Sequence, residues 1–171
     1  MKKYLFLFFA ASVLGYIWEV LLFLLKEDRF YNRGFFYGPW LPVYGLGAVL
    51  LDLGLHWLSS HPVYVFFLSL FIGTGVELAI GLILDLFWNR RYWDYSGYIL
   101  NLDGYICLSS ALAFGFAGML WICFVTPRLL KALDALLPKH QNLLLTIIAL
   151  VFLFDLAVSL IFPNAGQGVT F

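Results

Sequence analysis

Residues 63–88 read VYVFFLSLFIGTGVELAIGLILDLFW, and the only charged side chains in this stretch are Glu77 and Asp85. A helix of about 20 mostly apolar residues is long enough to cross the hydrocarbon core of a bilayer. The stretch follows a short turn at His61-Pro62 and meets that requirement with residues to spare. It therefore predicts a membrane-spanning helix, and it decides the class of fold to which the whole chain belongs.

The composition of the chain supports the same class. Of its 171 residues, 63% are hydrophobic and only 12% are charged, whereas soluble domains carry about 25% charged residues. Ten basic residues balance ten acidic ones, and no basic block provides the concentrated positive field that a nucleic-acid partner requires. We therefore expect a membrane protein, in contact with lipid, that does not bind nucleic acid.

Four further stretches resemble residues 63–88 in length and apolar character. We expect an all-α fold, a polytopic membrane helix bundle of about five transmembrane helices, in a single integral membrane domain over residues 1–171. The first stretch starts like a signal peptide, but its apolar run is too long and contains Glu19, so we interpret it as a retained helix. The predicted spans are 4–25, 41–60, 63–88, 106–125 and 143–162.

The connections between these spans differ in character. Residues 26–41 and 89–105 are rich in aromatic residues, glycine and arginine, and the span count predicts that they lie together on one membrane face. Residues 127–137 predict a separate amphipathic helix, with Thr126 as its N-cap and Pro127 at its first position. Such a helix lies flat in the interface or docks on a partner subunit. Basic residues are divided five to five between the faces, so the orientation stays open.

Acidic side chains inside the spans are the costly part of this sequence. Each costs about 2.5–3.5 kcal/mol at a helix centre on the insertion scale, so we expect them to face protein, a cavity or the interface. Gly73, Glu77, Gly81 and Asp85 recur at every fourth position and predict a seam between helices. The five carboxylates are Glu19, Asp52, Glu77, Asp85 and Asp155.

Two of these carboxylates have a polar neighbour one turn away. Asp52 and His56 form either a proton relay or a pair of side chains that simply hydrogen-bond to each other. The same two interpretations apply to Asp155 with Ser159.

Glu19 and Glu77 have a different context, because an arginine follows each of them fourteen residues later. These arginines, Arg33 and Arg91, lie in the two connections that share a face. Ion pairing or a common polar cavity explains the pattern, and the cavity is either functional or an architectural clamp.

Long motifs in the two connections resemble a known family. The segments RGFFYGPWLPVYGLG (33–47) and YWDYS (92–96), with Glu19 and Glu77, are similar to the putative ABC-transporter type IV family of bacterial membrane proteins, also called CmpB-like. The resemblance covers roughly residues 12–125. It implies a multi-pass protein of the bacterial inner membrane, an ABC-type permease working with a separate ATPase subunit, since the chain itself has no Walker A loop. It transfers no substrate and no catalytic residue.

The motif residues also have a physical interpretation. Their aromatic side chains form an interfacial belt or a cap over a polar site, and their mixed charges, with Asp103, suit a zwitterionic or phosphate-bearing headgroup. The candidates for a substrate site or polar cavity are Glu19, Arg33, Tyr37, Tyr44, Glu77, Arg91, Trp93, Asp94, Tyr95 and Asn101.

Three functions compete at this point. The first is a transport component with a polar intramembrane site between the first four spans, and the second is a membrane enzyme acting on a lipid headgroup. The third is a non-transporting assembly or regulatory subunit. The sequence contains no nucleophile-base pattern and no metal-ligand spacing, so we expect no catalytic residue, no metal and no cofactor.

A shift of 58 residues aligns the first part of the chain with the second. It places Gly15 on Gly73 and Glu19 on Glu77, and it also places Arg33 on Arg91 and Tyr37 on Tyr95. This register predicts a parallel duplication of two-helix units.

Overall fold

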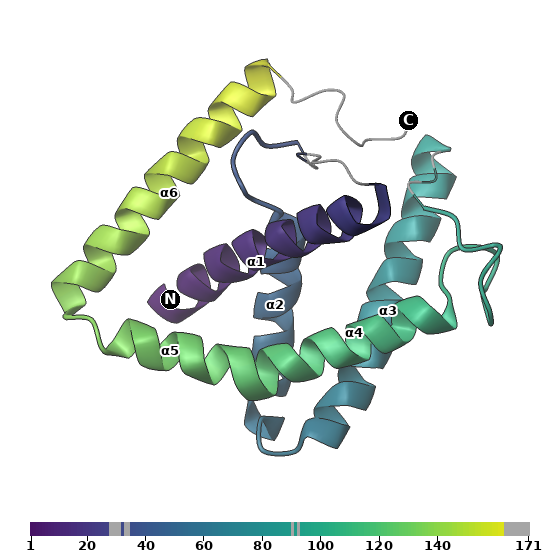
Figure 1. Cartoon of the computed structure of the whole chain (residues 1–171), viewed down its shortest axis with the longest axis horizontal. Coiled ribbons are helices and arrows are strands. Elements are labelled where there is room, and N and C mark those ends of the chain that lie inside the picture. Colours follow the sequence, from purple (N-terminus) through teal and green to yellow (C-terminus); the bar gives the residue numbers. More distant parts are fainter. Residues whose placement is uncertain (28–31, 33–34, 90, 92, 163–171) are drawn as a thin grey trace. The chain divides into compact units, whose positions relative to one another are not determined.

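The computed structural model describes residues 1–27, 32, 35–89, 91 and 93–162, and it is all-α in this part of the chain (Figure 1). A single isolated bridge joins Leu102 and Ile106. The helices are α1 (Lys2–Glu27), α2 (Pro42–Leu55), the short 3₁₀-helix η1 (His56–Leu58), α3 (Pro62–Trp88), α4 (Leu108–Leu120), the π-helical turn η2 (Trp121–Val125), α5 (Thr126–Asp134) and α6 (Pro138–Ile161).

Four of these helical segments are long and apolar enough to cross a membrane: Lys2–Leu25, Pro62–Phe87, Leu108–Asp134 and Pro138–Ile161. They confirm the polytopic membrane class. The predicted span 41–60 is shorter than expected, because α2 and η1 together cover only Pro42–Leu58. At 1.5 Å per residue this helix is roughly 25 Å long, less than the hydrocarbon thickness of about 30 Å.

α5 begins at Thr126, but the prediction that Thr126 is an N-cap is wrong. Thr126 has helical backbone angles (φ −53°, ψ −49°), is fully buried and donates its N–H to the carbonyl of Trp121. The helix therefore continues from Leu108 to Asp134. Pro127 has no N–H and its ring would crowd the carbonyl four residues earlier, and a π-helical turn just before it accommodates that misfit without ending the helix.

The expected polar stripe of α5 is present. Arg128, Lys131 and Asp134 are exposed, whereas Leu133 is buried. Whether this helix lies in the membrane interface or on a partner subunit stays a prediction.

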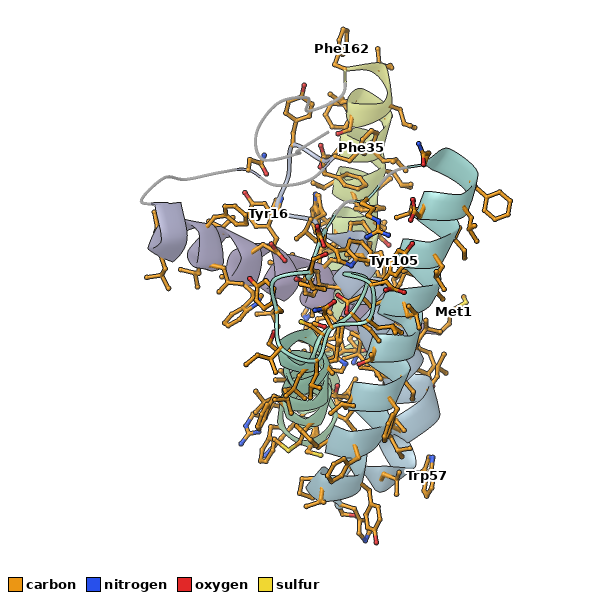
Figure 2. The ribbon with its side chains drawn as sticks, turned by 90° about the vertical axis from the view of Figure 1, so that its right-hand side faces the viewer. Met1, Tyr16, Phe35, Trp57, Tyr105 and Phe162 are labelled. Atoms are coloured by element: carbon orange, nitrogen blue, oxygen red, sulfur yellow. The ribbon has the colours of Figure 1, made fainter. Side chains whose placement is uncertain are left out.

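Contacts divide the chain into two compact units. Among the described residues, the terminal unit comprises 1–50 and 128–162, and the central unit comprises Leu51–Pro127. Large apolar side chains stand out from the helices of both units, among them Trp57 and Phe162 in Figure 2. Such exposure is what helices surrounded by lipid require.

The core of the terminal unit is aromatic. Buried Phe9, Phe36 and Trp40 pack with Phe152 of α6, whose ring stacks on that of Phe36 at 5.2 Å between centroids. Trp40 belongs to the segment that precedes α2, so this segment is folded against α1 and α6. The chain enters α2 in a defined position, because the Leu41 N–H bonds to the Ser12 carbonyl at 3.1 Å.

The core of the central unit consists of α3 packed against α4 and η2. Buried Leu55, Val65 and Ile122 form its apolar cluster. Toward the middle of α3, a Cβ atom on Gly73 would lie 2.5 Å from Cγ of Phe114. The predicted seam along Gly73, Glu77, Gly81 and Asp85 is confirmed, because α4 and the segment before it contact all four positions.

Candidate functional site

Glu77 lies at the centre of a hydrogen-bonded cluster in the central unit. Its Oε1 accepts a hydrogen bond from the phenol of Tyr95 at 3.0 Å, and its Oε2 accepts one from the hydroxyl of Ser110 at 2.9 Å. Glu77 comes from α3, Tyr95 from the segment 93–107, and Ser110 from the first turn of α4. We call these three residues the Glu77 centre.

The course of residues 93–107 explains how these groups meet. After α3 ends, the chain runs back along the last turns of this helix, as the contacts of Tyr105 show (Figure 2). A Cβ atom on Gly81 would lie 2.9 Å from the Tyr105 ring. One turn further along, the Tyr105 hydroxyl donates to Asp85. The segment thus covers the C-terminal part of α3, and α4 begins beside Glu77, well inside the length of α3.

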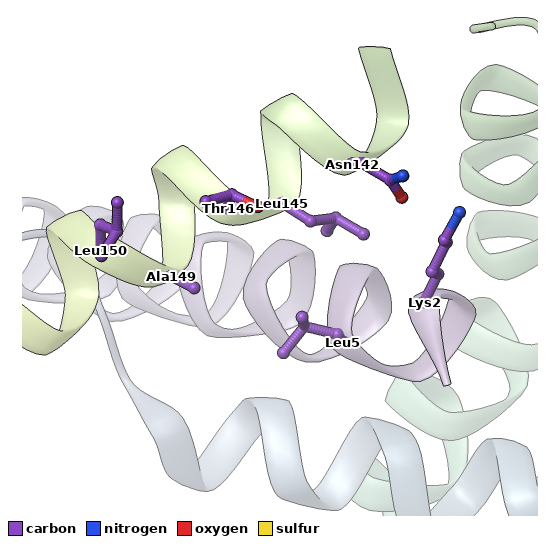
Figure 3. A pocket seen from close by; sticks show the side chains of 7 residues that line it. All are labelled: Lys2, Leu5, Asn142, Leu145, Thr146, Ala149 and Leu150. Carbon is purple, nitrogen blue, oxygen red and sulfur yellow. The ribbon is translucent and has the colours of Figure 1, made fainter. Parts of the chain in front are cut away.

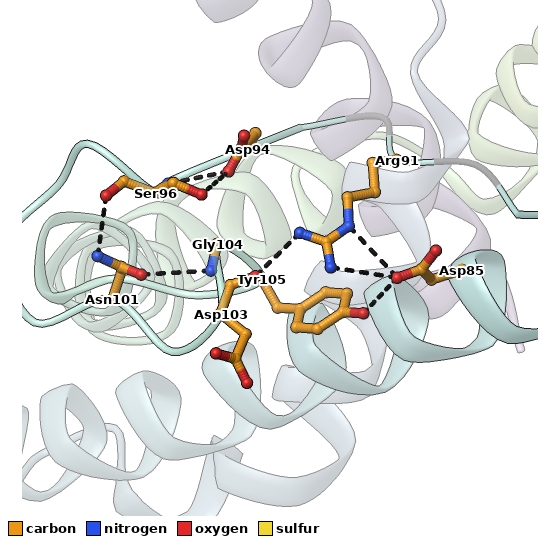
Figure 4. Close-up of polar contacts among 8 residues, drawn as sticks. All are labelled: Asp85, Arg91, Asp94, Ser96, Asn101, Asp103, Gly104 and Tyr105. Atoms are coloured by element: carbon orange, nitrogen blue, oxygen red, sulfur yellow. Dashed lines mark hydrogen bonds and ion pairs between the residues drawn. The ribbon is translucent and has the colours of Figure 1, made fainter.

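Arg91 contacts Asp85 and not Glu77, which corrects the ion pair suggested by the fourteen-residue spacing. Its guanidinium lies 3.2 Å from Asp85 Oδ2, donates to the Asp103 carbonyl at 2.9 Å and stacks over the Tyr105 ring at 4.4 Å (Figure 4). This fork of contacts fixes the start of the segment to the end of α3. Among the described residues, the partners of Glu77 are therefore hydroxyl groups.

The other site candidates in the segment 93–107 form hydrogen bonds that stabilise its turns. Trp93 Nε1 donates to the Tyr105 carbonyl at 2.8 Å, and Asp94 Oδ1 accepts the Ser96 N–H at 2.9 Å. Asn101 donates to the Tyr98 carbonyl at 2.9 Å and accepts the Gly104 N–H at 3.3 Å. Figure 4 shows the bonds of Asp94 to Ser96 and of Asn101 to Ser96 and Gly104. Trp93, Asp94 and Asn101 are therefore positioning residues around the Glu77 centre.

The electrostatics of the segment follow from these contacts. Hydrogen bonds from the side chain and the backbone of Ser96 hold the pKa of Asp94 below its usual value. Desolvation acts to lower the pKa of Arg91, but the hydrogen bonds and charges of Asp85 and Tyr105 outweigh it and raise that pKa. Burial and the negative charge of Glu77 raise the pKa of Tyr95, so its phenol remains a hydrogen-bond donor.

A second carboxylate with a tyrosine partner lies in the terminal unit. The phenol of Tyr44 donates to Glu19 Oε1 at 2.5 Å, and the Tyr44 ring occupies the space that a Cβ atom on Gly15 would need. Two of the site candidates, Glu19 and Tyr44, are thus in contact, whereas Arg33 lies outside the described residues.

Tyr37 contacts Asp155 through its backbone, and its ring is about half exposed. The backbone N–H groups of Tyr37 and Gly38 donate to the two carboxylate oxygens of Asp155 at 3.2 and 2.9 Å. Asp155 also accepts a long bond from Ser159 at 3.4 Å. Asp155 thus holds the segment before α2 against α6, which the sequence did not indicate.

The predicted pair of Asp52 and His56 is present. His56 Nδ1 lies 3.3 Å from Asp52 Oδ1, with Asp52 buried and the imidazole about half exposed.

Helix contacts recur in the two units. In the terminal unit, Phe8 contacts Gly45 and Tyr44 contacts Gly15. The corresponding contacts in the central unit are those of Phe66 with Gly115 and of Phe114 with Gly73. The positions in the first helix of each pair differ by 58, whereas those in the second helix differ by 70. The 58-residue register therefore does not extend into the second helices, since the connection before α4 is longer. This recurrence supports the duplication, which we retain as a proposal.

The structure also contains a shallow apolar groove of about 320 Å³ between α1 and α6 (Figure 3). Lys2 is its only charged lining residue, and Leu5 of its wall lies about four turns of α1 away from Glu19. The groove is therefore separate from the carboxylates. No cluster of three metal-ligating side chains occurs in the described part of the chain.

Sequence reasoning missed Ser110 and Tyr105. Ser110 belongs to a capping box with Cys107 at the start of α4, and the Cys107-Leu108-Ser109-Ser110 pattern was the available signal for a helix start. Tyr105 gave no signal in the sequence, because its contact with Asp85 depends on the path of the segment.

A family model described as putative ABC-transporter type IV matches residues 6–160. The chain belongs to this family. The match reaches into α6, beyond the region of roughly 12–125 in which the sequence motifs carry the resemblance, and it therefore includes Asp155. No curated protein and no solved structure matches the chain.

Proposed function

We propose that this member of the ABC-transporter type IV family is the membrane-spanning component of an ABC-type permease in a bacterial inner membrane, working with a separate ATPase subunit. The Glu77 centre is its intramembrane polar site. The family and the four apolar helices support the class. The site rests on one observation, namely a carboxylate inside an apolar span that hydroxyl groups from two other segments contact.

The position of Glu77 is what favours a functional role. It lies ten residues before the end of the apolar stretch Pro62–Phe87, where a carboxylate costs about 2.5–3.5 kcal/mol on the insertion scale. Ionisable residues at such depth commonly mark ion or substrate pathways. A clamp between helices alone could be built from neutral side chains at a lower cost.

The hydrogen bonds around Glu77 suit a group that changes its charge. The Ser110 hydroxyl has one proton and two acceptors in reach, Glu77 Oε2 at 2.9 Å and the Cys107 carbonyl at 3.0 Å. It donates to Glu77 when the carboxylate is ionised. When Glu77 is protonated, the Ser110 oxygen accepts a hydrogen bond from the carboxyl O–H, and the Ser110 hydroxyl donates to the Cys107 carbonyl instead. Glu77 thus keeps a partner in either state, as the uptake of a proton or a cation requires.

The experiment is complementation of a strain that lacks the gene. Glu77→Gln keeps the size of the side chain and removes its charge, and it should abolish complementation at an unchanged protein level in the membrane. Asp103→Asn is the matched control, because this exposed carboxylate points away from the contacts drawn around Arg91 (Figure 4). Asp85→Asn should have a smaller effect than Glu77→Gln, since Asp85 lies near the end of α3.

A second arm tests the ATPase. Deletion of an ATPase gene that neighbours the permease gene should reproduce the phenotype of the strain without the permease. Equal tolerance of Glu77→Gln and Asp103→Asn would contradict the site, and a silent ATPase deletion would contradict the permease. Turnover of labelled lipid by the purified protein would favour a membrane enzyme instead.

A further inference from the structure

The groove between α1 and α6 has a polar end and an apolar end (Figure 3). The Lys2 ammonium and the Asn142 amide lie at one end, and Ala149 and Leu150 lie at the other. The groove thus has the polarity of an amphiphile, with a charge at one end and hydrocarbon along the rest. Its remaining lining residues are Leu5, Leu145 and Thr146.

The two ends of the groove lie at different depths of the membrane. Lys2 is the first residue of the apolar span Lys2–Leu25, and Asn142 is the last of the polar residues that open the span Pro138–Ile161. The polar end therefore lies at the membrane surface. Leu150 follows Asn142 by eight residues, about 12 Å along α6, and half of the hydrocarbon core is about 15 Å thick. The groove therefore lies within one leaflet.

The surface around the polar end is basic. Lys2 and Lys3 open α1, Lys139 and His140 lie in the first turn of α6, and neither first turn contains an acidic residue. The preceding helix α5 adds two basic residues against one acidic residue. Among the described residues, no carboxylate forms an ion pair with Lys2. The N-terminal ends of α1 and α6 also have a partial positive charge, so an anionic group complements this end of the groove.

The size and the surroundings of the groove indicate the rest of its occupant. Its volume of about 320 Å³ is at the lower end of the range of about 300–1,000 Å³ found for small-molecule sites. Both of its walls belong to helices that are long and apolar enough to cross a membrane. Its open side is therefore at the level of the acyl chains, and it has room for one of them.

We propose that this groove binds one anionic phospholipid. The phosphate accepts hydrogen bonds from the Lys2 ammonium and the Asn142 amide, and one acyl chain lies between α1 and α6 against Leu5, Leu145 and Ala149. A zwitterionic choline lipid has the same phosphate, but its positive charge is repelled by the basic surface, which is why the proposal names an anionic lipid. The inference is independent of what the Glu77 centre transports.

Native mass spectrometry of the full chain, released from detergent micelles, tests the charge. We expect one molecule of phosphatidylglycerol to bind several-fold more tightly than phosphatidylcholine with the same acyl chains. Lys2→Gln should weaken this binding about 5-fold, which corresponds to about 1 kcal/mol for one lysine beside anionic lipid. Lys3→Gln is the matched control, because Lys3 lies in the same turn but does not line the groove, and it should have little effect.

Filling the groove tests the position of the acyl chain. Thr146→Phe places a ring in the groove and should also weaken the binding of phosphatidylglycerol several-fold. Ile147→Phe is its control, because Ile147 is exposed on the same helix but does not line the groove. Leu150→Trp, nearer the apolar end, is a second filling variant. Thr146 and Leu150 are exposed, so these variants should keep the helical circular dichroism.

Each alternative occupant has its own signature. Equal losses in Lys2→Gln and Lys3→Gln would show diffuse attraction to a basic surface, and unchanged binding in both filling variants would place the acyl chain elsewhere. Displacement of the lipid by soluble glycerol 3-phosphate at equal concentration would show a site for the anion alone. A dimer that Thr146→Phe dissociates would show that a second copy of the chain occupies the groove. Each of these four results would overturn the proposal.

Discussion

Gly73→Ala is the sharpest test of the seam between α3 and α4. The new Cβ atom would lie 2.5 Å from Cγ and 2.6 Å from Cβ of Phe114. Because a Cβ atom is fixed to the backbone, no rotation of the Phe114 side chain removes this overlap. The two helices have to move apart, which weakens the packing that small residues permit in membrane bundles.

Gly75→Ala is a matched control on the same helix. A Cβ atom at Gly75 meets nothing within 4 Å, so this variant gains only the helix propensity of alanine, about 1 kcal/mol. The same gain applies at Gly73 and cancels in the comparison. The difference between the variants then isolates the overpacking cost, about 1–3 kcal/mol, which is about 5-fold to about 140-fold in the unfolding equilibrium constant.

The assay is reversible unfolding of the protein in mixed micelles, followed by circular dichroism. We expect Gly75→Ala to be at least as stable as the wild type and Gly73→Ala to be less stable than both. If the two variants were equally stable, α3 and α4 would not approach each other as closely as described, and the structural basis of the Glu77 centre would fail with them.

Three further predictions concern the polar contacts. Asp155→Ala removes the acceptor of two backbone N–H groups, each bond to a charged group contributing about 1.5–3 kcal/mol, and should lower the melting temperature much more than Ser159→Ala. Tyr44→Phe and Tyr95→Phe should each reduce complementation, because each removes the phenol that donates to a carboxylate; an unaffected Tyr44→Phe beside an impaired Tyr95→Phe would separate Glu19 from the function of Glu77. The pKa of Asp94 is lowered in the folded segment, so its contribution is present above the usual aspartate pKa and is lost as the pH falls through the folded value. Amide exchange across residues 93–105, corrected for its intrinsic pH dependence, should therefore show less protection at acid pH, and Asp94→Asn should remove this change.

Hydropathy was sufficient to predict the long spans, because a bilayer imposes their length and composition on the sequence. The four-residue spacing of Gly73, Glu77, Gly81 and Asp85 was also sufficient to predict a packed seam. Both are local properties of a helix, and neither depends on the path of the connections.

The two predictions that failed depend on more than the spacing of residues along a regular α-helix. Thr126 and Pro127 have the pattern of a helix start, but the π-helical turn at Trp121–Val125 lets the helix continue. The spacing of Glu77 and Arg91 suggested an ion pair, but Arg91 pairs with Asp85, which is only six residues away. The segment after Arg91 returns along α3, so that Tyr95 contacts Glu77. A motif can identify such residues without specifying their partners.

The contact of Asp155 with Tyr37 and Gly38 has a consequence for biosynthesis. These partners are 118 and 117 residues apart in the chain, and a ribosome adds about 5–20 residues per second. Synthesis of the chain from the family motif before α2 to Asp155 therefore takes about 6–24 s. During this interval the motif lacks its Asp155 contact and depends on other contacts for its shape. Limited proteolysis of ribosome-bound chains should cleave this segment until Asp155 has left the exit tunnel, whereas cleavage that stops earlier would show that α1 and α2 alone can hold the motif.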